Sequence, residues 1–294
     1  MDEEKRGPII EEEWDEDERV DWEEEKGDSK GNKIPVPPRQ HKEEVDGLET
    51  TLDIRLFHHQ ETTVKEMEKI EREKMRVVGR SKVELTMGVL GDLPGYGKTL
   101  STVALIDRNK MEWDMSTPFV YEEIETFGPS STFICKRLVK KERLDCTLIV
   151  CSLSLLSRWE TEIKHSKHTK KKRKLAYHIV SKRSHFEIDP NDYDIVLVSD
   201  KMYNEFVSQF STFAWKRFVY DEAASNHIPS METIYAGFYW FVTATFPDLN
   251  RVGGRKYHFL RSIFHRISPD LFQLMIVKND DEYVRASYKT VSYT

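Results

Sequence analysis

The chain has few cysteines and no long apolar run, and each shortage excludes a class of protein or of binding site. Only three cysteines occur among its 294 residues, and their odd number and spacing fit neither a disulfide framework nor a zinc site. We therefore expect Cys135, Cys146 and Cys151 to be ordinary buried thiols in a reducing compartment. There is no signal peptide and no apolar run long enough to cross a bilayer, so we expect an intracellular, soluble protein without a membrane partner.

Apolar residues are scarce at the N-terminus, where acidic residues dominate. Residues 1–28 contain 15 acidic and 4 basic residues, a net charge of −11, which leaves 41 basic and 36 acidic residues, or +5, for the rest. Such a block of like charge is typical of a solvated, disordered tail; the alternative is an acidic arm that binds a basic protein partner or competes with nucleic acid. Pro35, Pro37 and Pro38 then predict a stiff linker, so tail and linker together span residues 1–47.

Residues 48–294 are long enough for a folded domain, and their apolar residues form short runs. Such runs, alternating with polar helical stretches, predict an α/β fold: a mostly parallel sheet with helices on both faces. The expected strands are Val83–Leu90, Thr147–Cys151, Ala176–Val180, Ile195–Ser199, Phe218–Tyr220 and Tyr239–Thr243. The expected helices are Thr62–Arg76, Leu100–Ile106 and Leu155–Ile163. Residues 107–146 form an unusually long connection, and their aromatic residues predict an insertion that folds back on the domain.

The stretch Gly91–Thr99, with the sequence GDLPGYGKT, is the most informative in the chain. It lies between an expected strand and an expected helix, which is the layout of a phosphate-binding loop. Gly95 and Gly97 permit positive φ angles that turn backbone N–H groups toward an anion, and the helix adds its positive dipole end. Lys98 can reach the β- and γ-phosphates, and the Thr99 hydroxyl can bind Mg²⁺. The stretch predicts a nucleoside triphosphate site, and the alternative is a simple glycine-rich turn.

An acidic pair, Asp221 and Glu222, follows the expected strand Phe218–Tyr220. The carboxyl ends of parallel strands form the ligand side of a doubly wound sheet, so we expect the pair near the phosphate loop. Asp221 can hold Mg²⁺ through water, and Glu222 can accept a proton from an attacking water. Taken alone, the pair also fits a helix N-cap with an acidic first turn, but its place after another strand favours catalysis.

In this order the motifs resemble those in the first motor domain of superfamily-two helicases, and among them the Swi/Snf-type DNA translocases, over Leu56–Thr245. The resemblance implies a RecA-like P-loop NTPase domain that binds ATP and Mg²⁺ and hydrolyses ATP. In those translocases an aspartate also stands where Asp92 replaces the glycine of the general loop pattern. Leu56–Gln60 resembles their adenine-reading motif, which implies that Gln60 reads the base. The implied nucleotide contacts along the loop are Gly95, Tyr96, Gly97, Lys98, Thr99 and Leu100.

The same resemblance implies nucleic-acid contacts. Leu148–Glu160 is similar to a motif that grips one DNA strand, with Ser152 and Ser154 contacting phosphates. Ser199 ends a stretch in the place of a further DNA-contacting motif. Residues 243–245 are similar to the Ser/Thr-Ala-Thr motif, which implies that Thr243 and Thr245 couple the phosphate site to nucleic acid. The implied partner is double-stranded DNA or another nucleic acid.

The densest positive patch of the chain is Lys164–Lys174, which we expect in a surface loop between a helix and a strand. Two interpretations stay open: a solvated turn, which would also serve as a nuclear localisation signal, and a salt-sensitive contact with the nucleic-acid backbone. We expect the nearby Trp159 to pack in the core rather than to stack on a base.

Two departures from the family pattern bear on activity. Ala224 stands where the family's acidic box has histidine, which puts the coupling between hydrolysis and DNA in doubt. The residues after Thr245 are too few for the second RecA-like domain that supplies arginine fingers in such motors. We therefore expect the ATP-binding and ATP-hydrolysing half of a DNA-dependent helicase or translocase, which moves on nucleic acid when joined in cis or in trans to a second domain.

An alternative function belongs to a different class. The chain would then be a stand-alone half-motor that serves as an interaction module or a virion structural component with little or no ATPase activity. Pro94–Thr99 and Lys110–Asp114 look most like helicases of nucleocytoplasmic large DNA viruses. That likeness implies a location in the nucleus, a viral factory or the virion.

Overall fold

The computed structural model describes residues 48–78, 81–127, 133–167, 173–251, 258–264 and 267–290. All the elements below belong to one compact unit, Ile34–Thr294. The expected acidic tail and linker, residues 1–47, lie outside the described residues, and so does the centre of the basic run, residues 168–172.

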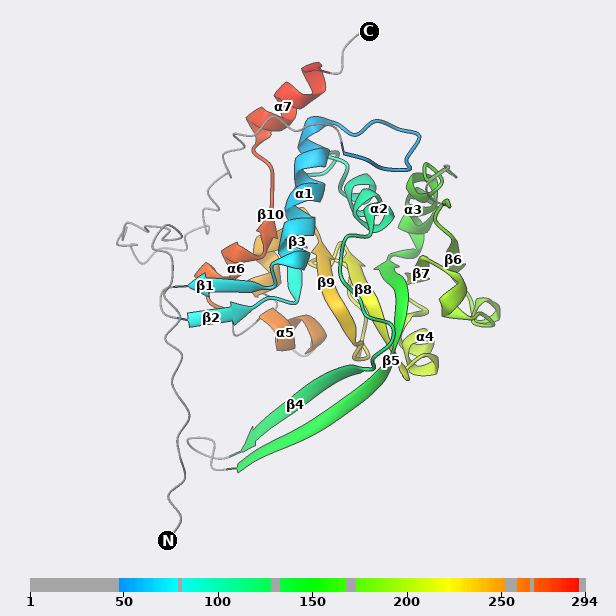
Figure 1. Ribbon diagram of the computed structural model, residues 1–294, viewed down its shortest axis with the longest axis vertical. Coiled ribbons are helices and arrows are strands. Elements are labelled where there is room, and N and C mark those ends of the chain that lie inside the picture. The colour runs from blue at the N-terminus through cyan, green and yellow to red at the C-terminus, as the bar shows by residue number, and fades with distance from the viewer. Residues whose placement is uncertain are drawn as a thin grey trace. The chain divides into compact units, whose positions relative to one another are not determined.

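The described chain folds into strands, α-helices and short 3₁₀ helices (Figure 1). The strands are β1 Met75–Val78, β2 Ser81–Glu84, β3 Met87–Leu90, β4 Phe119–Phe127, β5 Phe133–Cys151, β6 Tyr177–Val180, β7 Ile195–Ser199, β8 Phe213–Asp221, β9 Ala236–Val242 and β10 Ile276–Val277. The α-helices are α1 His58–Arg72, α2 Lys98–Arg108, α3 Leu156–Ile163, α4 Tyr203–Gln209, α5 His258–Phe264, α6 Pro269–Leu274 and α7 Asp281–Thr290. The 3₁₀ helices are η3 Leu153–Leu155, η4 Arg183–His185, η5 Pro190–Asp192 and η6 Phe246–Arg251.

The central sheet is parallel, with the strand order β10-β3-β9-β8-β5-β7-β6. Its register places Leu90 of β3 beside Val242 of β9, and Val242 beside Asp221 of β8. The segments that leave these three strands therefore start at the same edge of the sheet. Parallel α/β sheets bind their ligands at this edge, beyond the carboxyl ends of the strands.

Helices cover both faces of the sheet because successive side chains along each strand point to opposite sides. In β7, for example, Ile195 and Leu197 pack in a core with α1, α2 and α3. Val196 and Val198 pack on the other side in a core with α4, α5 and α6. Buried strands of this kind read as continuous apolar runs, which is why the sequence predicts them well. No helix among the described residues is both long enough and apolar enough to span a membrane.

Of the expected elements, only Ile195–Ser199 has the bounds that the sequence predicts, and the others begin or end elsewhere. The expected strand Val83–Leu90 is two strands, since β2 ends at Glu84 and pairs with β1 while β3 begins at Met87. The helix expected at Thr62–Arg76 begins at His58 and ends at Arg72. Its earlier start has a physical cause, because the Gln60 side chain accepts a hydrogen bond from the Phe57 N–H at 2.9 Å and caps the first turn.

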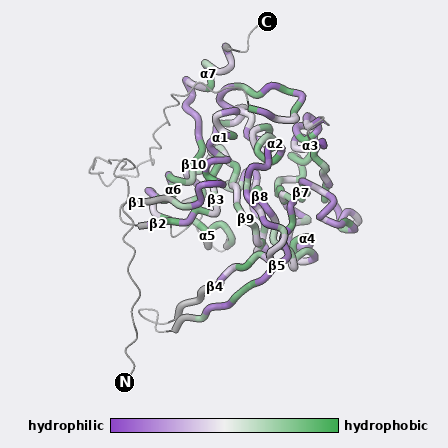
Figure 2. The backbone as a smooth tube through the Cα atoms, in the orientation of Figure 1, coloured by the Kyte–Doolittle hydropathy of each residue, from purple (hydrophilic) through white to green (hydrophobic). Residues whose placement is uncertain are grey.

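The long connection at 107–146 contains an antiparallel ribbon made by β4 and the first part of β5 (Figure 1). Its base packs on the domain, because the Trp113 ring lies close to Gly237 of β9 and against the apolar core beside it. The Trp113 indole N–H also donates to the Leu144 carbonyl at 3.0 Å. Farther along, Val120 and Leu138 are exposed, and hydrophilic and hydrophobic residues alternate on the ribbon (Figure 2). The ribbon also contacts the domain beyond its base, since the Tyr121 ring lies 5.9 Å from that of Tyr235, whose hydroxyl donates to Glu123. Cys135 of β5 is exposed, so the expectation of a buried thiol is wrong there, whereas Cys146 and Cys151 are buried.

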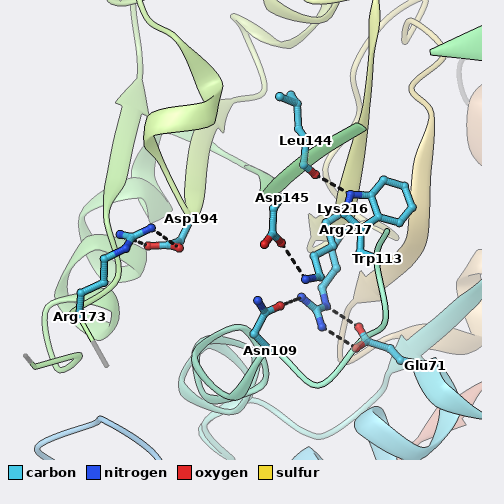
Figure 3. Close-up of polar contacts among 9 residues, drawn as sticks. All are labelled: Glu71, Asn109, Trp113, Leu144, Asp145, Arg173, Asp194, Lys216 and Arg217. Atoms are coloured by element: carbon cyan, nitrogen blue, oxygen red, sulfur yellow. Dashed lines mark hydrogen bonds and ion pairs between the residues drawn. The ribbon is translucent and has the colours of Figure 1, made fainter. Parts of the chain in front are cut away.

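An ion pair is buried between the helices and the sheet (Figure 3). Arg217 of β8 donates to both carboxylate oxygens of Glu71 in α1, at 2.6 and 2.7 Å, and each side chain is only 1% exposed. Trp240 of β9 donates to the same carboxylate at 2.9 Å, and Asn109 at the end of α2 accepts from Arg217 at 3.2 Å. This network fixes α1 and α2 against two central strands.

We predict that Glu71→Gln lowers the free energy of unfolding by about 3–5 kcal/mol, because it leaves the Arg217 guanidinium buried without a counter-charge. Urea denaturation followed by circular dichroism measures the loss. The matched control is Glu205→Gln, which breaks the exposed pair with Arg183 and should change stability little. Equal stability of the Glu71→Gln variant and the wild type would contradict the role given to the pair.

Candidate functional site

The predicted phosphate loop runs from Gly91 to Gly97 and joins β3 to α2. Gly95 has a φ of 87° and Gly97, the N-cap of α2, a φ of 79°, conformations that L-residues rarely adopt. A Cβ atom at Gly97 would lie 2.0 Å from the Gln60 amide nitrogen. The loop therefore requires glycine at these two positions, and it places the buried Gln60 side chain directly against Gly97.

Lys98 opens α2, and its side chain folds back over the loop. The ammonium donates to the carbonyls of Asp92 at 2.9 Å and Leu93 at 3.3 Å. Burial lowers the pKa of Lys98, while the carboxylates of Glu222, Asp92 and Asp221 act in the opposite direction. Asp92 follows β3, whereas Asp221 ends β8 and Glu222 comes directly after it.

The next two residues of α2 differ in their surroundings. Thr99 is buried in the first turn of the helix. Leu100 packs in a small apolar cluster with Leu56, Val64 and Ala104, so its side chain holds α2 against α1 and the segment before it. At a nucleotide site Leu100 could contribute its backbone N–H, because its side chain is committed to packing.

Asp221 ends β8 and is held from two sides. Its Oδ2 accepts the indole N–H of Trp159 at 2.7 Å, and its Oδ1 accepts the Glu222 backbone N–H at 3.1 Å. Burial raises the pKa of Asp221, and the hydrogen bond from Trp159 lowers it. Glu222 is half-buried and has a φ of 51°, a conformation that is strained for a residue with a side chain and typical of functional sites.

Asp92, at the start of the loop, is the centre of a buried polar network. Its two carboxylate oxygens accept from Asn279, at 2.7 Å from the backbone N–H and at 2.9 Å from the side-chain amide. The same amide donates to the Thr63 hydroxyl at 2.7 Å, and Thr63 lies 3.4 Å from Asp92. Burial raises the pKa of Asp92, and the bonds from Asn279 lower it. Asp92 therefore ties the loop to α1 and to the segment after β10, which a glycine could not do.

The predicted coupling and nucleic-acid residues lie at the ends of strands or just beyond them. Thr243 is buried after β9, and its hydroxyl lies 3.3 Å from that of the exposed Thr245. Ser152 follows β5, and its hydroxyl lies 2.9 Å from that of Ser154. Ser199 pairs with Cys151 in the sheet register, but it is fully buried and its hydroxyl oxygen has no hydrogen-bond partner among the described residues.

Three described cations of the basic run are paired with carboxylates of the chain. Lys164 lies 2.7 Å from Glu160, and Lys167 lies 3.1 Å from Asp53. Arg173 makes two hydrogen bonds to Asp194, at 2.7 and 2.9 Å (Figure 3). These pairs are exposed, so they compete only weakly with a nucleic-acid phosphate.

Two residues of the site have roles that were not predicted from the sequence. Trp159 is fully buried, as expected, yet it also donates to Asp221, and an apolar position carries no sign of such a bond. Asn279 lies 187 residues after Asp92 in the chain, outside every motif that the sequence shows. Folding alone brings it to the loop.

Comparisons with known proteins give a family and a fold. The family model described as SNF2-related domain matches residues 59–230. The Sulfolobus solfataricus SWI2/SNF2 ATPase core in complex with dsDNA has a TM-score of 0.51 and 18% identity over 80% of this chain and 47% of that chain. The Sulfolobus solfataricus SWI2/SNF2 ATPase core domain has a TM-score of 0.50 and 18% identity, over 86% of this chain and 50% of that chain. Comparison with curated proteins finds no match.

The likeness to these solved structures confirms the expected RecA-like α/β fold. The chain spans about half the length of each structure. The strand order brings the phosphate loop and Asp221 to one edge of the sheet, and the helices on both faces support that edge.

We predict that Trp159→Phe destabilises the protein by about 1.5–3 kcal/mol at pH 8, because it removes a hydrogen bond to a charged carboxylate. That bond lowers the pKa of Asp221, so its contribution is present above this pKa and is lost as the pH falls through it. The destabilisation should therefore shrink toward pH 4 in metal-free urea titrations.

Trp113→Phe is the matched control, because its indole N–H donates to the neutral Leu144 carbonyl. Its effect on stability should be smaller and independent of pH. A Trp159→Phe effect that stays constant with pH would show that the bond does not serve the Asp221 carboxylate.

Proposed function

The chain belongs to the SNF2-related domain family, and we propose that it is the ATP-Mg²⁺-binding half of a motor that moves on DNA. One observation carries the proposal. The ammonium of Lys98 donates to the Asp92 carbonyl over the phosphate loop, and the sheet register brings this loop to the same edge as Asp221 and Glu222, at the end of a strand two places away. A lysine, a glycine-rich loop and an acidic pair at one sheet edge are the parts that a phosphoryl-transfer site needs.

Each predicted residue would have one task at this site. The loop N–H groups from Gly95 to Leu100 would surround the phosphates, and Lys98 would contact the β- and γ-phosphates. Gln60, which lies against Gly97, would read the adenine. Glu222 would accept the proton of the attacking water.

The residues at the loop fit a magnesium ion. Mg²⁺ prefers oxygen ligands, which the Thr99 hydroxyl and the Asp221 carboxylate supply directly or through water. A cation near Asp221 would also offset the cost of burying this carboxylate, which shows in its raised pKa. Bound Mg²⁺ would neutralise the charge that develops on the phosphates during transfer.

Nucleic acid would bind beyond the same sheet edge. Ser152 is half-buried and Ser154 exposed, and we expect their neighbouring hydroxyls to contact a phosphate backbone. Thr243 and Thr245 follow β9, which lies between β3 and β5 in the sheet order, and they would couple the two sites. Ser199 would take part only through its backbone or after a local movement, because its side chain is buried. The solved structure with dsDNA makes double-stranded DNA the first partner to test.

Movement would require a second RecA-like domain, joined in cis or supplied in trans, to complete the site with arginine fingers. Residues from such a domain raise the rate of related phosphoryl transfers by roughly 10³–10⁵.

A second candidate function is an interaction module that keeps the nucleotide site. Two observations favour this module. The ribbon exposes the apolar side chains of Val120, Tyr121 and Leu138, and Ala224 stands where the family has a histidine. The likeness to viral helicases, and the viral or nuclear location that it implies, belong to the proposal as well.

We predict that Lys98→Ala weakens binding of a fluorescent ATP analogue with Mg²⁺ by at least about tenfold, because it removes a charge-assisted contact to the phosphates. Equilibrium titration of the 294-residue chain measures this change. Lys140→Ala, which removes an exposed lysine from the ribbon, is the control and should bind like the wild type. Equal affinities of the Lys98→Ala variant and the wild type would rule out this loop as the triphosphate site.

We also predict that the 294-residue chain alone hydrolyses ATP slowly, and that double-stranded DNA stimulates it little. The reason is that the arginine fingers would come from the second domain. A phosphate-release assay with and without DNA measures both rates. Rapid, DNA-stimulated turnover would show that these residues already form a complete motor.

A further inference from the structure

Helix α7 follows β10 after a short connection and lies near the start of α1 (Figure 1). Its side chains contact the phosphate loop. The Tyr288 hydroxyl donates to the Gly95 carbonyl at 3.1 Å. In the other direction, the Tyr96 hydroxyl donates to Asp281 at 3.2 Å. Hydrogen bonds therefore connect both residues at the tip of the loop to a helix that belongs to none of the motifs found in the sequence.

A fully buried histidine adds a third connection. His59 Nε2 lies 3.1 Å from the Tyr96 carbonyl, and its Nδ1 lies 3.0 Å from the Ser287 hydroxyl of α7. A carbonyl only accepts, so Nε2 carries a proton, and in a neutral ring Nδ1 then accepts from the Ser287 hydroxyl. The Ser287 oxygen in turn accepts the His59 backbone N–H at 3.2 Å. Burial lowers the pKa of His59, which agrees with a neutral ring in this arrangement.

These contacts set the direction of backbone groups in the loop. A trans peptide unit is planar, so its C=O and the N–H of the next residue point in opposite directions. When His59 holds the Tyr96 carbonyl on the α7 side, the Gly97 N–H must point to the other side. Gly97 is the N-cap of α2, where an N–H that points away from the protein contributes to an anion site.

We propose that Ser287 and Tyr288 of α7, the first acting through His59, are positioning residues that hold the phosphate loop in its anion-binding conformation. This role rests on the nucleotide site proposed above. It extends that site to a helix near the C-terminus of the described chain. The affinity for triphosphate then depends on whether α7 is docked.

A purely structural role for α7 would rest on ring packing rather than on hydroxyl groups. Tyr288 packs edge-on against Phe57, with ring centroids 4.7 Å apart, and against His59 at 5.2 Å. The test must therefore remove the hydroxyls and keep the rings. Tyr288→Phe and Ser287→Ala do this with little change in shape.

Tyr283→Phe is the matched control on the same helix, because the Tyr283 hydroxyl lies 2.8 Å from that of Thr62 in α1. Each of the two test variants should weaken binding of a fluorescent ATP analogue with Mg²⁺ by about three- to tenfold, the usual effect of one lost hydrogen bond. The control should bind like the wild type, and all three variants should keep its melting temperature within a few degrees.

Amide hydrogen exchange without nucleotide gives a second readout. Exchange at residues 91–99 should be faster in Tyr288→Phe and Ser287→Ala than in the wild type, while α2 and β8 keep their protection. If the wild type binds no nucleotide, the proposed function fails, but the exchange still tests the positioning role. Wild-type affinity together with wild-type exchange in both variants would overturn it, and so would equal losses in the Tyr283→Phe control.

Discussion

The buried carboxylate of Asp92 is the constraint on which the candidate site depends. A carboxylate is costly to bury, and here two hydrogen bonds from Asn279 and a longer contact from Thr63 offset that cost. Because the partners come from α1 and from the segment after β10, the loop can start only where these elements meet. The Asp92 carbonyl then accepts the Lys98 ammonium. Replacement of the usual glycine thus adds an anchor to the loop.

The parallel sheet supplies the other half of the site. Its order brings the ends of β3, β9 and β8 together, so residues more than a hundred positions apart share one edge without any local pattern to join them. Below that edge, the Arg217–Glu71 pair fixes α1 to the sheet. Above it, α7 holds the tip of the loop. The loop is therefore supported from both sides. Such support preorganises a site that must bind a triphosphate in one defined geometry.

The parallel strands and the phosphate loop could be predicted from the sequence, because their residues form recognisable local patterns. Strands such as Ile195–Ser199 are buried on both faces and are continuously apolar, and Gly95 and Gly97 mark the positive φ angles. The contacts of Asn279 and Tyr288 with the loop, and of Ser287 with His59, could not be predicted, because they join residues 187, 193 and 228 positions apart. The bond from Trp159 to Asp221 was missed for a related reason: packing alone sets the direction of a buried indole N–H.

The central claim is that Gly91–Thr99 binds a triphosphate beside Asp221 and Glu222. Its most direct test is a crystal structure of the chain with Mg²⁺ and a non-hydrolysable ATP analogue. The account predicts triphosphate density within hydrogen-bond distance of Lys98 and the loop N–H groups, with the metal near Thr99 and Asp221. A nucleotide bound elsewhere on the domain, with the loop empty, would contradict it.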